Sequence, residues 1–262
     1  MKISSLNQVK QIAAKVPEIT LYFWITKLLT TGMGEVASDY LFEHLNPFIS
    51  APLSVLIFVA AMILQFKVRK YVPGVYWLVV VMVSIFGTMA ADVVRVGLGI
   101  PYLVSTIFFV VALAVILYTW FSKEKTLSVH SIVTTRREIF YWLTVLTTFA
   151  LGTSAGDMTA TSMHLGYFSS GLLFTGILVI PAIGYFLFGM KEIFAFWFAY
   201  ILTRPVGASF SDWLSASQSN GGMGFGSGVV SLVLTIFIII LVVFRGGSPA
   251  QSQDTKVDAK VA

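Results

Sequence analysis

A seventeen-residue pattern that occurs four times constrains this chain more than any other feature. FWITKLLTTGMGEVASD begins at Phe23, and its relatives YWLVVVMVSIFGTMAAD, YWLTVLTTFALGTSAGD and FWFAYILTRPVGASFSD begin at Tyr76, Tyr141 and Phe196. In each copy an aromatic residue precedes a Trp, a Gly follows that Trp by ten residues, and an Asp follows it by fifteen. This shared register predicts internal duplication. Each repeat would be a motif helix followed by a plain apolar companion helix.

The composition places these helices in a membrane. Of the 262 residues, 57% are hydrophobic and 11% are charged, whereas a soluble domain is about half apolar and about a quarter charged. A bilayer crossing needs roughly 20 residues. Eight segments qualify, and their long continuous apolar runs argue against a β-barrel. The expected spans are residues 20–42, 50–66, 74–94, 101–121, 138–160, 167–188, 192–214 and 227–244.

The charges between the spans set the expected orientation. Basic residues gather in every second connection, starting with Lys2, Lys10 and Lys15 before the first span. The positive-inside rule therefore predicts that both termini lie in the cytoplasm. An even number of crossings separates successive motifs, so all four motif helices run in the same direction. Each Asp then lies ~22 Å beyond its Trp, nearer the outside.

The sequence thus predicts an all-α integral membrane protein with eight transmembrane helices. They form four parallel helical-hairpin repeats in a pseudo-fourfold arrangement, with the motif helices inside and the companion helices outside. The N-terminus has no removable signal peptide pattern, and the polar, small-residue tail is expected to be disordered. The expected boundaries are a cytoplasmic N-terminal segment at 1–17, repeat 1 at 18–70, repeat 2 at 71–122, a cytoplasmic linker at 123–137, repeat 3 at 138–190, repeat 4 at 191–244 and a cytoplasmic tail at 245–262.

The four motif copies resemble a bacterial membrane-protein family of four tandem two-helix repeats, each with a characteristic Trp. The resemblance runs from about Val16 to Phe244, and all four Trp–Gly–Asp sets match. It implies the eight-span layout and a bacterial cytoplasmic (inner) membrane location. That family is known as a repeat of unknown function, so it implies no substrate.

One face of the motif helices carries the candidate binding residues. Positions seven, eleven, fourteen and fifteen after each Trp share one broad face at about 100° per residue. Polar faces turn away from lipid. The candidates for ion binding are Glu35, Asp39, Asp92, Asp157, Asp212, Thr31, Ser38, Thr88, Thr153, Ser211 and Arg204, of which the five acids are the candidate metal ligands.

Each charged candidate also has a second interpretation. The four Asp residues either converge on a cation or proton path, or mark the wetted outer ends of their helices. Glu35 stands where the other repeats have Thr or Ala, so it either binds an ion or forms a salt bridge to Arg204 or Arg95. Arg204 either pairs with such an acid or attracts an anion. Lys27 is expected to snorkel to the cytoplasm.

The remaining motif residues are expected to be structural. Small residues let helices approach closely in membranes, and Trp serves as an interfacial anchor or packs between helices. These residues are Trp24, Trp77, Trp142, Trp197, Gly34, Gly87, Gly152 and Gly207.

The expected function is transport of a small cation, favouring a divalent metal ion and leaving proton coupling open. Carboxylate oxygens suit hard divalent cations. The alternatives are a non-transporting scaffold or partner-binding protein, and an anion or solute carrier that uses Arg204.

The chain has no cysteine, nucleotide-binding loop or zinc signature, so no enzyme and no cofactor are expected beyond a divalent cation as substrate. The expected partners are the lipid bilayer and a small ion but no nucleic acid, and homodimerisation stays open.

Overall fold

The structure is a computed structural model that describes residues 14–246, without the side chains of residues 47–48 and 245–246. Most of the expected N-terminal segment at 1–17 therefore lies outside the described residues. So does the expected tail at 245–262, apart from the backbone of its first two residues.

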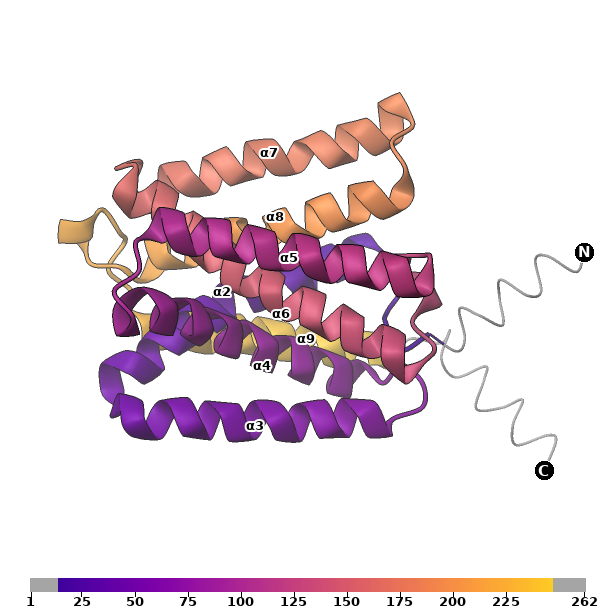
Figure 1. Cartoon of the computed structure of the whole chain (residues 1–262). Helices are drawn as coiled ribbons and strands as arrows, with labels where there is room; N and C mark the ends of the chain where they lie inside the picture. Colours follow the sequence, from indigo (N-terminus) through magenta and orange to yellow (C-terminus); the bar gives the residue numbers. More distant parts are fainter. Residues whose placement is uncertain (1–13, 247–262) are drawn as a thin grey trace, which may run out of the picture.

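The described residues form eight long helices that run along a common direction, and no strands (Figure 1). The motif helices are α2 (Leu21–His44), α4 (Pro73–Asp92), α6 (Thr135–Asp157) and α8 (Glu192–Ser215). The companion helices are α3 (Pro47–Lys67), α5 (Tyr102–Glu124), α7 (Tyr167–Phe188) and α9 (Ser227–Gly246). The π-helical turns η1 (Val93–Gly97) and η3 (Met158–Ser162) extend α4 and α6, and the short 3₁₀ turns are η2 (Val129–Ser131) and η4 (Gln218–Asn220).

The helix ends follow local sequence signals. The hydroxyls of Thr20 and Thr134 accept hydrogen bonds from backbone N–H groups in the first turns of α2 and α6, as expected of N-cap residues. Pro73 opens α4, where its missing N–H costs nothing. Gly189 ends α7 in a left-handed conformation, which glycine adopts without strain.

Seven of the described helices are long and apolar enough to cross a membrane. They are α3 to α9, with η1 and η3 continuing α4 and α6. The exception is α2, which is 24 residues long but carries Lys27, Glu35, Asp39 and Glu43. These helices are those of a multi-pass membrane protein.

The motif helices contact one another in a closed sequence. Helix α2 packs against α4 and α8, and α6 also packs against α4 and α8. Each companion helix packs mainly on the motif helix of the following repeat: α3 on α4, α5 on α6, α7 on α8 and α9 on α2. The packed helix pairs are therefore offset by one helix from the expected hairpins. The sequence repeats interlock, and contact between α9 and α2 joins the last repeat to the first.

The motif glycines explain why the motif helices lie so close. A Cβ added at Gly34 would overlap Ser84, one at Gly87 would lie 2.6 Å from the Phe149 Cβ, and one at Gly152 would overlap Arg204. The fourth glycine closes the series, because a Cβ at Gly207 would overlap Thr31. Each motif Gly thus accommodates the position-seven side chain of the next repeat, as small residues do at close helix contacts.

The interior changes character along the motif helices. Toward the Trp end the buried side chains form an aromatic core that includes Trp77, Trp142 and Trp197. Three of the four motif Trp residues are therefore inter-helix packing groups, and Trp197 Nε1 also donates to the Leu127 carbonyl at 2.9 Å. Further along, toward the Asp end, the buried side chains are mostly polar. These include Thr31, Glu35, Ser84, Thr88, Thr153, Arg204 and Asp212.

The glycine contacts predict an asymmetric response to alanine. In Gly207→Ala the new methyl would meet Thr31 Cβ at 2.9 Å and the Gly32 amide nitrogen at 3.0 Å. Such overpacking costs about 1 to 3 kcal/mol, more than the roughly 0.5 to 1 kcal/mol that Ala gains over Gly in a helix. We expect a lower apparent Tm in detergent. The matched control is Gly176→Ala in α7, where nothing lies within 4 Å; equal Tm values for the two variants would contradict the close contact.

Candidate functional site

Arg204 lies at the centre of the bundle and contacts all three other motif helices. Its side chain is fully buried. Nη1 donates to the Thr31 carbonyl of α2 at 2.7 Å, and Nη2 donates to Glu35 Oε2 at 2.5 Å. Nη2 also donates to the hydroxyl of Thr88 in α4, and to that of Thr153 in α6 at 2.8 Å. One guanidinium therefore connects the four motif helices.

Glu35 receives these interactions on a single oxygen. The hydroxyls of Thr88 and Thr153 each donate to Oε2 at 3.0 Å, in addition to Arg204. Of the two interpretations given for Arg204 and for Glu35, the salt bridge between them is the one that the structure shows.

The repeat register explains how these four side chains meet. Glu35, Thr88 and Thr153 occupy position eleven of repeats 1 to 3, where repeat 4 has Ala208. Arg204 stands at position seven of repeat 4, one helical turn earlier. Its long side chain extends toward this level, where Ala208 is small. Glu35 and Arg204 both differ from the residues at the same positions of the other repeats, and their opposite charges neutralise each other.

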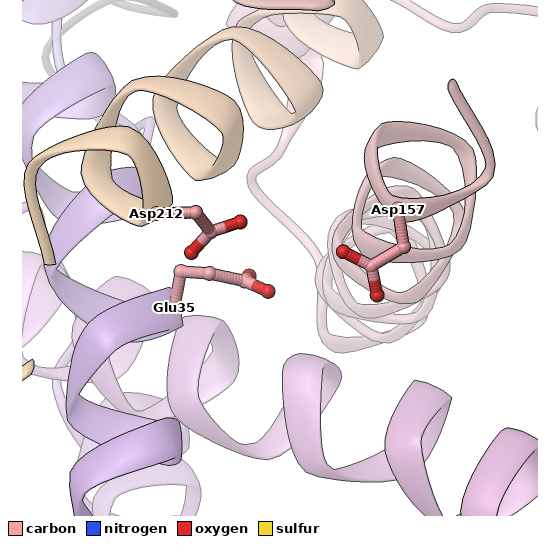
Figure 2. Close-up of side chains that lie close together, drawn as sticks. All are labelled: Glu35, Asp157 and Asp212. Atoms are coloured by element: carbon pink, nitrogen blue, oxygen red, sulfur yellow. The ribbon is translucent and has the colours of Figure 1, made fainter. Parts of the chain in front are cut away.

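A cluster of three carboxyl groups lies next to this pair. Glu35, Asp157 and Asp212 each offer an oxygen, and these oxygens all lie within 4.8 Å of one another. Figure 2 shows the three side chains extending from α2, α6 and α8 into one shared space. Asp212 is 8% exposed, and its Oδ1 is buried without a hydrogen-bond partner. We call these three residues the acidic cluster.

The other candidate residues lie around this cluster. Asp39 and Asp92 are half-buried and do not belong to the group of oxygens within 4.8 Å. Thr31 and Ser211 donate to backbone carbonyls, Thr31 to Leu28 at 2.7 Å and Ser211 to Ala208 at 2.8 Å. The Ser38 hydroxyl is buried without a partner.

Lys27 does not snorkel, contrary to the expectation from sequence. Its side chain is 1% exposed, and Nζ lies 3.8 Å from the ring centroid of Tyr200 and 4.8 Å from that of Phe149. The reason is its helix position. Lys27 stands at position three, near the buried face of α2 and opposite Tyr200, the position-three residue of repeat 4. The faces of the aromatic rings attract the amine when it is charged.

The sequence marks Lys27 in the same way as Glu35, by a residue that differs from those at the same position of the other repeats. Val80, Val145 and Tyr200 fill position three in the other repeats, so Lys27 is a single-copy departure. Phe149 is another, because position seven is polar in the remaining repeats. The guanidinium carbon of Arg204 lies 5.1 Å from the same Phe149 ring. Phe149 therefore has a cationic side chain near it from each of two helices.

Four segments match the protein family described as Repeat of Unknown Function (DUF347): residues 22–71, 75–126, 140–190 and 195–245. The chain belongs to this family. Each DUF347 match begins two residues before a motif Trp and extends through the companion helix, so the resemblance inferred from the four motifs is confirmed. Searches of curated proteins and of solved structures found no match.

In this DUF347 protein, the Arg204–Glu35 pair predicts strong energetic coupling. Arg204→Met would leave Glu35 buried without its charge partner, which costs about 3 to 5 kcal/mol. Adding Glu35→Gln removes the stranded charge, so we expect the double variant to be more stable than Arg204→Met alone. Apparent Tm values in detergent for both single variants and the double variant measure this coupling.

A surface pair provides the control for this cycle. Arg136 pairs with Glu124, and the Arg136 side chain is 67% exposed. The Glu124 side chain is 6% exposed, but it keeps its bond to Arg137 at 2.6 Å when Arg136 is replaced. Because an exposed cation in such a pair contributes about 0 to 1 kcal/mol, Arg136→Met should change the Tm little. Additive effects of the Arg204 and Glu35 substitutions would contradict the buried pair.

Proposed function

We propose that this protein transports a small cation, and that a divalent metal ion fits best, across the bacterial cytoplasmic membrane. The observation that carries the proposal is the acidic cluster, in which the buried Oδ1 of Asp212 has no partner. Carboxylates this close repel one another unless a cation or a proton lies between them. The cluster therefore has the charge and the oxygen ligands of a cation site.

The coordination chemistry favours a hard divalent ion over a soft one. Oxygen ligands from carboxylates suit Mg²⁺, Ca²⁺ and Mn²⁺, whereas soft metals prefer sulfur. The chain has no cysteine, and the cluster contains only carboxyl groups. Hydroxyl groups from Ser38 and Ser211 lie on the same helix faces, where water and hydroxyl oxygens would complete a coordination shell.

We further infer how the chain is placed in the membrane. Helix α2 would be the eighth span, its charged side chains being sheltered by α4, α8 and α9. The cyclic glycine contacts favour an approximate fourfold arrangement about an axis along the membrane normal. With the termini in the cytoplasm, the acidic cluster would face the outside, and Asp39 and Asp92 would line its approach.

The Arg204 guanidinium would compete with the transported ion for the carboxylate of Glu35. Its guanidinium occupies one oxygen of Glu35, and the aromatic core lies beyond it toward the Trp end. An ion bound at the acidic cluster passes inward only when this pair opens. In this proposal the described conformation would be a closed one, with the cluster on the outer side of the pair.

The two alternatives have less support. An anion carrier would need Arg204 as a free contact, but both terminal nitrogens of its guanidinium donate within the bundle. A non-transporting scaffold would use the acids only to mark a helix end, which does not explain why Asp212 is 8% exposed with an unpartnered oxygen. Ion flux through the purified protein decides between the scaffold and the transporter.

Uptake of Mn²⁺ into proteoliposomes tests the proposal. We expect the wild-type protein to carry Mn²⁺, and Asp212→Asn and Glu35→Gln each to lower the initial rate at least about tenfold, since each removes one of three anionic ligands. Both substitutions keep the shape of the side chain. The rate is read from quenching of an enclosed metal-sensitive dye.

Glu192→Gln serves as the matched control. Glu192 lies at the other end of α8 from Asp212, and its side chain is 67% exposed. The Glu192→Gln variant should carry Mn²⁺ at the wild-type rate. Failure of the wild-type protein to carry Mn²⁺, or equal rates for Asp212→Asn and Glu192→Gln, would refute the proposed site.

A further inference from the structure

Lys27 is a buried ionisable group that the proposed ion path leaves without a role. Its side chain is 1% exposed, and among the described residues its Nζ has no hydrogen-bond partner. Its close neighbours are the rings of Tyr200 and Phe149, at 3.8 and 4.8 Å from Nζ. A buried lysine normally has a carboxylate or several acceptors to hold its charge. This lysine has the faces of two aromatic rings instead.

The charged and titratable groups around Lys27 come from each motif helix. On α2 itself the nearest acid toward the Asp end is Glu35, whose Oε2 is bonded to Arg204. Helix α8 contributes Arg204 and Tyr200. Helices α4 and α6 carry Tyr76 and Tyr141 in the aromatic core, with their hydroxyl oxygens 2.6 Å apart. The α9 segment from residue 227 to 244 contains no ionisable side chain, and α3 has only Lys67, at its end.

Lys27 and Arg204 are electrostatically linked through the space around Phe149. The Lys27 Nζ lies 4.8 Å from the centroid of this ring and the Arg204 guanidinium carbon 5.1 Å from it. Two buried positive charges that lie near the same ring repel each other, because an interior of low dielectric constant screens them little. Arg204 therefore has two competing influences: attraction to Glu35 on one side and repulsion from a charged Lys27 on the other.

We propose that Lys27 is a proton-binding site that couples cation transport to the opposite movement of a proton. When Lys27 is an ammonium, it repels Arg204 and keeps the guanidinium on Glu35, which closes the path. Opening of the path to water would let the ammonium transfer its proton to that water. The neutral amine no longer repels Arg204, which can then move toward the Phe149 ring. Glu35 is then free for the incoming cation. This inference rests on the proposed transport function and assigns its coupling to one residue.

Two substitutions fix the charge of Lys27 in opposite states. Lys27→Met is neutral and similar in length, so it mimics the amine. Lys27→Arg is always charged, because arginine does not release its proton in proteins. A purely structural role would make both variants less stable without separating their transport behaviour. A coupling role separates them.

The experiment measures Mn²⁺ uptake and lumenal pH together in proteoliposomes, with dyes for each ion. In the wild type we expect protons to leave the lumen as Mn²⁺ enters it, so that the lumenal pH rises. We also expect the Mn²⁺ uptake rate to change with external pH. In Lys27→Met we expect Mn²⁺ uptake to persist while the accompanying proton flux falls at least about tenfold and the pH dependence is lost. In Lys27→Arg we expect Mn²⁺ uptake to fall at least about tenfold, because the charge is fixed.

The outcomes separate this inference from the function on which it rests. If the wild type carries no Mn²⁺, the proposed function fails and the coupling fails with it. If the wild type carries Mn²⁺ and Lys27→Met still exchanges protons as the wild type does, only the coupling is overturned. Size-exclusion profiles and apparent Tm values confirm that each variant is folded; if one is not, Lys27→Gln replaces Lys27→Met as the neutral form.

Discussion

The ion pair between Arg204 and Glu35 is the interaction on which the centre of this molecule depends. Burying two opposite charges is costly unless they are also hydrogen-bonded. Here Thr31, Thr88 and Thr153 on the surrounding helices bond the pair, and among the described residues only the Nε of the Arg204 guanidinium has no partner. The pair therefore fixes the relative rotation of all four motif helices. It also neutralises one acid of the acidic cluster, which leaves Asp157 and Asp212 as the uncompensated part of the proposed cation site.

Residues shared by the four repeats and residues found in a single repeat have different roles in this fold. The shared residues build the frame, because each motif Gly accommodates the position-seven side chain of the next repeat. The residues that occur in one repeat alone supply the central ion pair and the buried lysine, whereas the shared Asp157 and Asp212 supply two of the three carboxyl groups of the acidic cluster. Glu35, Arg204, Lys27 and Phe149 are the single-repeat residues, and they lie next to one another along the centre of the bundle. A frame of identical repeats would offer only a ring of equivalent groups.

The sequence predicted the parts of this structure that depend on periodicity along one helix. The eight helices and the buried polar face follow from residue spacing, whereas spacing leaves both the pairing of Arg204 with an acid and its contact with an anion open. Spacing does not give distances between side chains on different helices, so it could not show that Glu35 lies with Asp157 and Asp212 rather than with Asp39. It also could not show that α3 packs on α4. The expectation that Lys27 snorkels fails for the same reason, because the sequence does not show which rings of other helices surround its side chain.

The most direct test of this account is an experimental structure of the protein in Mn²⁺, with the ion located by its anomalous scattering. The account predicts one strong peak between the carboxyl groups of Glu35, Asp157 and Asp212, with Arg204 displaced from Glu35 or sharing it with the ion. A structure at saturating Mn²⁺ with no peak among these three side chains, and with Asp212 paired to another protein group, would contradict it.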